Sequence, residues 1–184
     1  MSAFSSSFIF LLQTLGGLYI MAVLLRFLLQ AVRADFYNPI SQAVVKITSP
    51  LLSPLRKIIP GFGGIDAASL VLALILQIAL IYGLLAIQGF PPAMVPVPQV
   101  VITSLVKLAD HILNIYMYSL IIIAIASWVA QGSYNPGLML LHQLTEPLSS
   151  RVRKVIPPVG GLDFSLMAII IIIYFLKNLL AGIA

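Results

Sequence analysis

Four polar residues near the start of a long apolar segment have the spacing that proton or cation transfer through a membrane would need. Lys107, Asp110, His111 and Asn114 stand at i, i+3, i+4 and i+7, so a helix presents them on one face. They could line a vestibule for a cation or a proton, because ionisable residues inside membrane spans often mark such paths. The pattern favours the simpler alternative, which is a polar stripe at the membrane surface with a Lys107–Asp110 pair.

A second polar stripe lies late in the first apolar segment, where Arg26, Gln30 and Arg33 stand at i, i+4 and i+7. An arginine at the centre of a bilayer costs roughly 2.5–3.5 kcal/mol on insertion scales, whereas one near the end of a span can extend its head to the surface. We therefore expect Arg26 to reach the lipid headgroups or to dock against the segment that follows. An ion path along this stripe is the weaker alternative.

The composition sets the class of protein that carries these residues. Of 184 residues, 61% are hydrophobic and 8% are charged, and the mean hydropathy is +1.12. A soluble domain is about half apolar and a quarter charged, so the chain is expected to be an integral membrane protein. It has no cysteine, which excludes disulfides and thiolate chemistry. Nothing in it resembles a catalytic constellation, a metal cluster or a nucleotide-binding loop, so we expect neither an enzyme nor a cofactor.

Four segments are long and apolar enough to cross a bilayer, which takes about 20 helical residues. They cover approximately residues 8–31, 67–87, 99–130 and 164–182. No lysine or arginine precedes the first of them, so we interpret it as a retained span rather than a signal peptide. The expected fold is an all-α integral membrane protein with four transmembrane helices.

The chain contains an internal duplication. Residues 37–66 return as residues 134–163, 97 positions later and without a gap, and 14 of the 30 positions are identical. The chain therefore repeats a unit of span, connector and span, and an even number of spans in each unit makes the two repeats parallel. The expected division is a first repeat at 1–88 with its connector at 38–66, a proline-rich link at 89–98, and a second repeat at 99–184 with its connector at 135–163.

Residues that cap and interrupt helices recur in both connectors. Asn38 followed by Pro39 predicts a helix start, and Pro50 predicts a break between two short helices. Asp66 is expected to cap the next span and could also pair with Arg56, with proton handling as the alternative role of this carboxylate. The matched set is Asn38, Pro39, Pro50, Pro60 and Asp66 in the first connector and Asn135, Pro136, Pro147, Pro157 and Asp163 in the second.

Both connectors are predicted to be amphipathic and too short to span, so they should lie in the plane of the membrane surface. Their basic residues would face lipid phosphates, or else a cytoplasmic partner, rather than nucleic acid. These residues are Lys46, Arg56, Lys57, Arg151, Arg153 and Lys154. Together with Arg33 they are seven of the ten lysines and arginines. The positive-inside rule then predicts cytoplasmic connectors and external termini.

The first repeat resembles the repeat of the YggT family, also called YlmG, over the run LLRFLLQAVRADFYNPISQAVVKITSPLLSPLRKIIPGFGGIDAASLVLALILQ. The second repeat departs from it at Arg151, which replaces Pro54, and lacks counterparts of Arg26 and Asp35. The residues that carry the resemblance are Asn38, Pro39, Thr48, Pro50, Pro54, Leu55, Arg56, Ile59, Pro60 and Asp66.

The resemblance implies a small, multi-pass protein of the bacterial inner membrane, in a family with chloroplast relatives and no established biochemical activity. It further implies links to osmotic or potassium tolerance, to division and nucleoid organisation, and to the assembly of membrane complexes. No catalytic residue follows from it.

Two functional hypotheses follow from the residues and the resemblance together. In the first, the protein is a non-catalytic accessory or scaffold protein whose paired connectors bind anionic headgroups or a larger membrane complex. In the second, it is a small oligomeric protein that moves ions, with the polar stripes lining the path.

Overall fold

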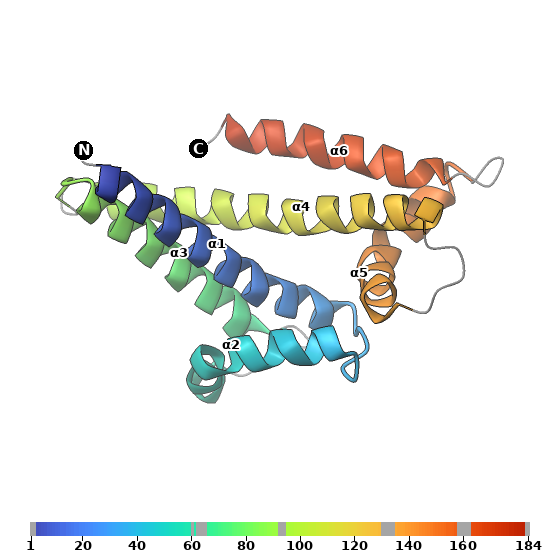
Figure 1. The fold of residues 1–184 in the computed structure, drawn as a ribbon, viewed down its shortest axis with the longest axis horizontal. Helices are drawn as coiled ribbons and strands as arrows, with labels where there is room; N and C mark the ends of the chain where they lie inside the picture. Colours follow the sequence, from blue (N-terminus) through green and yellow to red (C-terminus); the bar gives the residue numbers. More distant parts are fainter. Residues whose placement is uncertain are drawn as a thin grey trace.

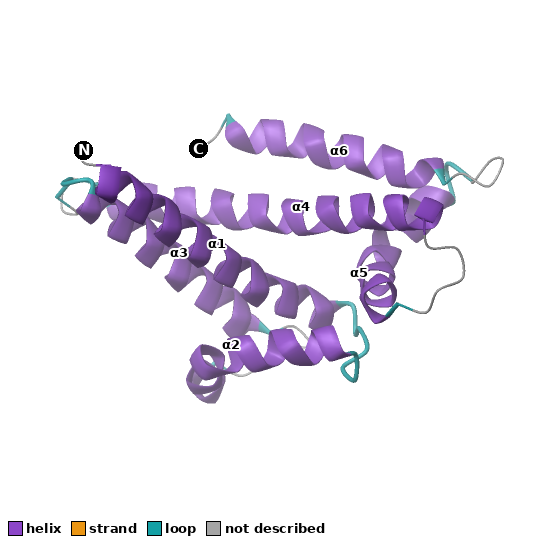
Figure 2. Ribbon diagram, viewed as in Figure 1, coloured by secondary structure: helices purple, strands orange, loops and turns teal. Residues whose placement is uncertain are grey.

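The computed structural model describes residues 3–59, 61, 66–91, 95–129, 135–157 and 163–182. These residues form helices and no strand (Figure 2). The helices are α1 (Ala3–Ala31), α2 (Pro39–Ile58), α3 (Ala67–Ile87), α4 (Val97–Val129), α5 (Pro136–Arg153) and α6 (Phe164–Ala181).

Four of these helices are long and apolar enough to cross a membrane, as the sequence predicts. The spans cover Phe4–Ala31 in α1, Ala67–Ile87 in α3, Val97–Ser127 in α4 and Phe164–Ala181 in α6. Their outer surfaces carry large apolar side chains that are mostly exposed; Phe10 and Ile171, for example, are 70% and 66% exposed. Such surfaces require a lipid environment, so the all-α, multi-pass membrane fold is confirmed.

The two repeats run in the same direction. In Figure 1 the first turn of α1 and the last turn of α6 lie at one end of the molecule, and the connectors α2 and α5 lie at the other end. Spans α1 and α4 run towards the connectors, while α3 and α6 return from them. This is the arrangement of tandem, parallel repeats.

Helix α1 supplies most of the central core. Its side chains Ile20, Val23, Leu24 and Leu28 are buried, and the helix contacts α2, α3 and α4. Gly16 brings α1 close to α3, because a Cβ at this position would lie 3.0 Å from Cδ1 of Leu80. The neighbouring Gly17 faces open space, so only one member of the Gly-Gly pair serves the helix contact.

Connector α2 is one helix, and the prediction of two short helices was wrong. The helix runs from Pro39 to Ile58 with Pro50 and Pro54 inside it, and Figure 1 shows its second half turning away from the direction of the first. Proline removes a backbone donor and bends a helix. Around the bend, the Thr48 hydroxyl donates to Val44 O at 2.7 Å and the Ser49 hydroxyl to Val45 O at 2.6 Å. These bonds help to bend the helix without ending it.

Three faces divide the surface of α2. The first, with Ser41, Val44, Thr48 and Leu52, is buried against the spans. The second is an exposed apolar stripe of Ile40, Ile47, Leu51 and Ile58, whose spacing of seven, four and seven residues keeps it on one side of the helix. The third carries the exposed cations Lys46 and Lys57. A helix with this division fits a membrane surface, where one side meets lipid and the other meets water.

Connector α5 repeats the essential features of α2. It is also continuous through its internal proline, Pro147, and its buried Thr145 donates to Leu141 O at 2.9 Å, as Thr48 does to Val44 O in α2. The duplicated sequence therefore produces duplicated local structure.

Candidate functional site

Both connectors begin at the asparagine caps that the sequence predicts. Asn38 Oδ1 accepts a hydrogen bond from Ile40 N at 2.9 Å, and Asn135 Oδ1 accepts one from Gly137 N at 2.8 Å. The prolines that follow stand in the first turn, where their missing N–H costs nothing.

The same arginine–aspartate pair ties each connector to the span that follows. Arg56 Nη2 bonds Asp66 Oδ2 in the first repeat, as the sequence allows, and Arg153 Nε lies 3.2 Å from Asp163 Oδ2 in the second. Asp163 also caps α6, accepting a hydrogen bond from Ser165 N at 3.0 Å. Both pairs place a guanidinium and a carboxylate at the corner between connector and span.

Asp66 departs from the predicted capping role. It occupies the N-cap position of α3 but makes no capping bond to the amides of that helix. Its Oδ2 instead accepts hydrogen bonds from Arg56 and from the Ser69 hydroxyl. Burial by itself raises the pKa of this carboxyl, but these two donors outweigh the effect and hold the pKa below its usual range. Asp66 is therefore a charged partner of Arg56.

The two connectors are joined to each other at their N-terminal ends. Asn38 Nδ2 donates to Pro136 O at 2.7 Å, and Asp35 N donates to Gln143 Oε1 at 2.9 Å. Gly137 stands where the first repeat has Ile40, and a Cβ on it would lie 3.2 Å from Cδ1 of that isoleucine. At this matched position α2 therefore carries isoleucine and α5 carries glycine, and the glycine leaves room for the isoleucine side chain.

Arg26 docks against α2 rather than lining a path through the spans. Its Nη1 donates to Thr48 Oγ1 at 2.8 Å, to Ser49 Oγ at 3.1 Å and to Val45 O at 3.3 Å. The side chain is buried although it is charged, and its acceptors lie around the proline bend of α2. Docking against the following segment is one of the two outcomes that the sequence favours for Arg26 over an ion path.

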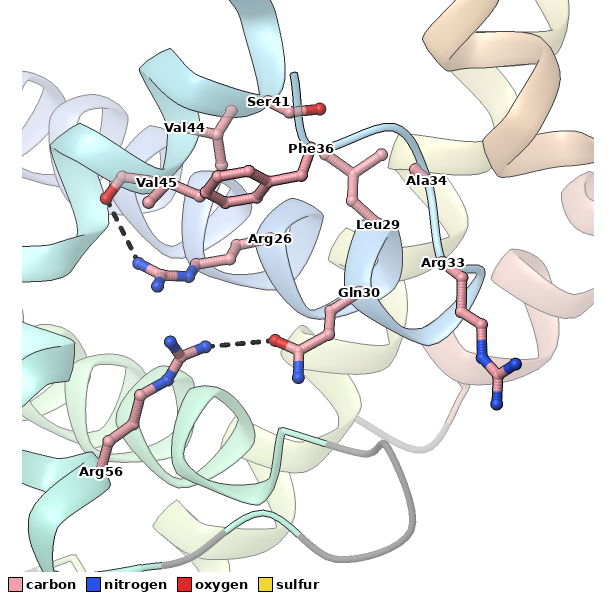
Figure 3. A pocket seen from close by; sticks show the side chains of 10 residues that line it. All are labelled: Arg26, Leu29, Gln30, Arg33, Ala34, Phe36, Ser41, Val44, Val45 and Arg56. Carbon is pink, nitrogen blue, oxygen red and sulfur yellow. Dashed lines mark hydrogen bonds between the residues drawn. The ribbon is translucent and has the colours of Figure 1, made fainter. Parts of the chain in front are cut away.

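A cavity of about 260 Å³ opens between α1 and α2 beside Arg26. Figure 3 shows the guanidinium groups of Arg26 and Arg56 directed towards the same space, with Gln30 beside them. Arg56 Nη2 donates to Gln30 Oε1 at 3.2 Å, which links connector α2 to the polar stripe of α1. The lining residues are Arg26, Leu29, Gln30, Arg33, Ala34, Phe36, Ser41, Val44, Val45 and Arg56.

The polar stripe of α4 forms a second cluster, but with a different partner from the predicted one. Asp110 Oδ1 lies 3.3 Å from Nζ of Lys177 on α6, and Lys177 Nζ also bonds Asn114 Oδ1. Lys107 is exposed and has no ion pair within the described ranges. Lys177 was missed because nothing in the local pattern of α6 indicates which helix it faces. The one available signal was a charged residue in an otherwise apolar span.

His111 completes this cluster without a hydrogen bond to Nδ1, which is buried. A neighbouring cavity of about 210 Å³ is lined by Lys107, Asp110 and Lys177 together with apolar residues of α4 and α6. This cavity and the one beside Arg26 share no lining residue. The two stripes therefore form separate sites, at opposite ends of the spans.

Four of the six basic residues of the connectors are both exposed and without an ion pair among the described residues. Lys46, Lys57, Arg151 and Lys154 have no ion pair within the part of the chain that the structure covers. Arg56 and Arg153 are instead engaged with carboxylates, and Arg153 additionally lies 3.2 Å from Glu146. Of the shared prolines, Pro157 follows α5 and Pro60 lies outside the described residues.

No group of three or more metal-ligating side chains occurs among the residues that the structure describes. The side-chain groups that form bonds in the two sites are guanidinium, ammonium, carboxylate, amide and hydroxyl groups. Groups arranged in this way can bind an anion or stabilise the contact between two helices.

The comparisons with known proteins agree with the duplication. The family model described as CCB3/YggT matches residues 5–87 and again residues 102–184. An uncharacterised protein of Pseudomonas aeruginosa is 50% identical over 90% of this chain and 83% of its own length. A protein of Vibrio alginolyticus is 42% identical, with 97% and 95% covered, and the YggT protein of Escherichia coli K12 is 40% identical, with 91% and 86% covered. No solved structure matches the chain.

Proposed function

The chain belongs to the CCB3/YggT family, and from that premise we propose that it is a non-catalytic accessory or scaffold protein of the bacterial inner membrane. Its two connectors form one basic platform at the cytoplasmic membrane surface. This platform contacts anionic headgroups and the cytoplasmic side of a partner membrane complex. This role would serve the assembly of membrane complexes, cell division or the response to osmotic stress.

The observation that carries this proposal is the direct join between α2 and α5. Asn38 bonds the backbone of α5, and each connector is tied to its own following span by an arginine–aspartate pair. A surface whose parts are already held in place loses less conformational entropy on binding than a pair of loose loops. The duplication thus yields one broad surface rather than two separate ones.

The exposed cations supply the chemistry of the platform. Lys46, Lys57, Arg151 and Lys154 are exposed on the two connectors, while the apolar stripe of α2 faces away from the protein. Each basic residue near an anionic leaflet contributes about 1 kcal/mol of attraction. Both features suit a platform at the lipid surface.

The experiment that tests the proposal replaces Lys46, Lys57, Arg151 and Lys154 by glutamine in the full chain. The tagged protein is extracted from native membranes in mild detergent, and the membrane proteins that co-purify in fixed ratio are measured. We expect a stoichiometric complex with the unaltered chain and its loss with the fourfold variant. Lys107→Gln, at the other end of the spans, is the control and should retain the complex. A fourfold variant that retains it would contradict the platform.

The ion-translocating alternative is favoured by one observation, the cluster of Asp110, His111 and Lys177 beside a cavity in the spans. Ion flux into liposomes that contain the purified protein distinguishes the two functions. The scaffold proposal expects no flux above that of empty liposomes. A flux that disappears in Asp110→Asn and in Arg26→Ala would overturn it.

A further inference from the structure

We propose that the cavity between α1 and α2 binds the phosphate group of an anionic phospholipid, held by Arg26 and Arg56, with Arg33 adding positive charge at the edge of the cavity. The inference deepens the proposed function and rests on it only for placing the connectors at the headgroup layer. It concerns the inner face of α2, whereas the platform uses the outer, exposed cations. One chain would hold one such lipid.

The charges around the cavity are unbalanced. Three arginines line it, and Asp66, which bonds Arg56, is the one carboxylate hydrogen-bonded to any of them among the residues described. Arg26 is bonded only by neutral groups, two hydroxyls and one carbonyl. Asp66 acts on Arg26 only through space and against the like charge of Arg56. A buried cation that no carboxylate bonds directly is costly, and an anion that enters the cavity reduces that cost.

Hydrogen-bond donors remain available at the same place. Arg26 makes all its bonds through Nη1, and Arg56 makes its bonds through Nη2. Each guanidinium has five N–H donors in a fixed fork, so the remaining nitrogens of both side chains find no acceptor within the described ranges. Guanidinium groups that converge on one space match the several oxygens of a phosphate group.

Ser41 is an independent observation that points to a ligand. Its side chain is only 5% exposed, its hydroxyl has no hydrogen-bond partner among the described residues, and it lines the cavity opposite the arginines (Figure 3). Buried hydroxyls without a partner are rare because they cost free energy. A bound headgroup would supply the missing partner.

The third arginine lines the cavity from a strained backbone position, and its guanidinium is directed away from those of Arg26 and Arg56 in Figure 3. Arg33 has φ 55, the left-handed conformation that usually needs glycine. It ends α1 with two closing bonds, from Arg33 N to Gln30 O at 3.1 Å and from Ala34 N to Leu29 O at 2.9 Å. Glycine would adopt this backbone conformation more easily than arginine. A need for positive charge at this position would explain why arginine stands there.

The walls favour a lipid over a soluble phosphate compound. Leu29, Phe36, Val44 and Val45 line the cavity, and Phe36 is exposed beside it. The exposed apolar stripe of α2 continues on the same helix. Acyl chains can therefore lie along apolar surface while the phosphate meets the arginines, which is an arrangement that a water-soluble anion cannot use.

The second repeat cannot form the same site. Ile123, Ser127 and Ala130 stand where the first repeat has Arg26, Gln30 and Arg33. The arginine–aspartate pair alone is kept, as Arg153 and Asp163. The duplication thus provides an internal comparison, with one repeat equipped for the anion and one not.

Native mass spectrometry of the delipidated full chain, titrated with phosphatidylglycerol, tests the proposal. We expect one tightly bound phosphatidylglycerol per chain. Arg33→Gln, which removes a charge but no side-chain hydrogen bond among the described residues, should weaken that binding by about tenfold, the effect of one charge-assisted hydrogen bond. Arg26→Ile, which copies the second repeat, should weaken it further. Lys107→Gln, at the other end of the spans, is the control and should bind as the unaltered chain does.

Three results would overturn the inference: equal binding by Arg33→Gln and Lys107→Gln, equal binding of phosphatidylcholine, or displacement of the lipid by glycerol 3-phosphate at similar concentration. The last would assign the cavity to a soluble phosphate compound. Arg33→Gln keeps the test valid if Arg26→Ile fails to fold, because Arg33 makes no side-chain bond within the described chain. Because the platform test uses other residues, failure of either proposal is recognised independently of the other.

Discussion

At the scale of single residues, the two repeats provide matched positions that differ in one partner. Thr48 and Thr145 are both buried and both donate to the carbonyl four residues earlier. Thr48 alone also accepts a hydrogen bond from Arg26, at 2.8 Å. The free energy of that contact can therefore be separated from the contribution of the threonine itself.

We expect Thr48→Val to destabilise the protein by about 1–3 kcal/mol, because it removes the nearest of the three acceptors of the buried Arg26 guanidinium. Thr145→Val removes only the local bond and should cost less than about 1 kcal/mol. The free energy of unfolding in detergent, measured with a chemical denaturant, compares the two variants. Equal losses would show that the Arg26 contact contributes nothing to stability.

At the scale of the elements, the join between the connectors depends on the difference between Ile40 and Gly137. A Cβ on Gly137 would approach Cδ1 of Ile40 to 3.2 Å, so even alanine requires a small shift. A branched side chain needs more room than this contact offers. The structure therefore makes Gly137 the position at which α2 and α5 can be separated.

We expect Gly137→Val to weaken the α2–α5 contact while both helices remain folded. Because the chain has no cysteine, single cysteines can be placed at Gln42 and His142, which are exposed on α2 and α5, and carry spin labels. The distance distribution between the labels should broaden in Gly137→Val. Gly17→Val, at a glycine with open space beside it, is the control. An unchanged distribution in Gly137→Val would mean that the contact is not needed to join the connectors.

At the scale of the whole molecule, the arrangement of the repeats makes a definite prediction about topology. The connectors lie at one end, and the turn after α3, which contains the exposed Phe90, lies at the other (Figure 1). Seven of ten basic residues lie in or beside the connectors. The positive-inside rule therefore predicts that this end faces the cytoplasm.

We expect a membrane-impermeant maleimide to label Phe90→Cys in intact spheroplasts. Gln42→Cys and His142→Cys should react only after the membrane is opened. Labelling of both connector positions from outside would reverse the orientation but keep the parallel repeats. Labelling of the two connectors from opposite sides would contradict the parallel arrangement itself.

The sequence by itself determined the spans, the parallel repeats, the asparagine caps and the possible Arg56–Asp66 pair. Each of these depends on residues that are near one another in the chain, or on hydropathy summed over about 20 positions. The same local reasoning failed at Pro50, where it predicted two helices. A bent helix survives there because hydroxyls of α2 bond the carbonyls at the bend and Arg26 bonds them from the side.

Only the tertiary structure decided which distant groups meet. Lys177 rather than Lys107 pairs with Asp110, Asn38 bonds a residue 98 positions away, and Arg26 and Arg33 come together with Arg56 around one cavity with Ser41. Contacts of this kind depend on which faces of separate helices meet when the helices pack. Periodicity along the chain identifies the faces but not their partners.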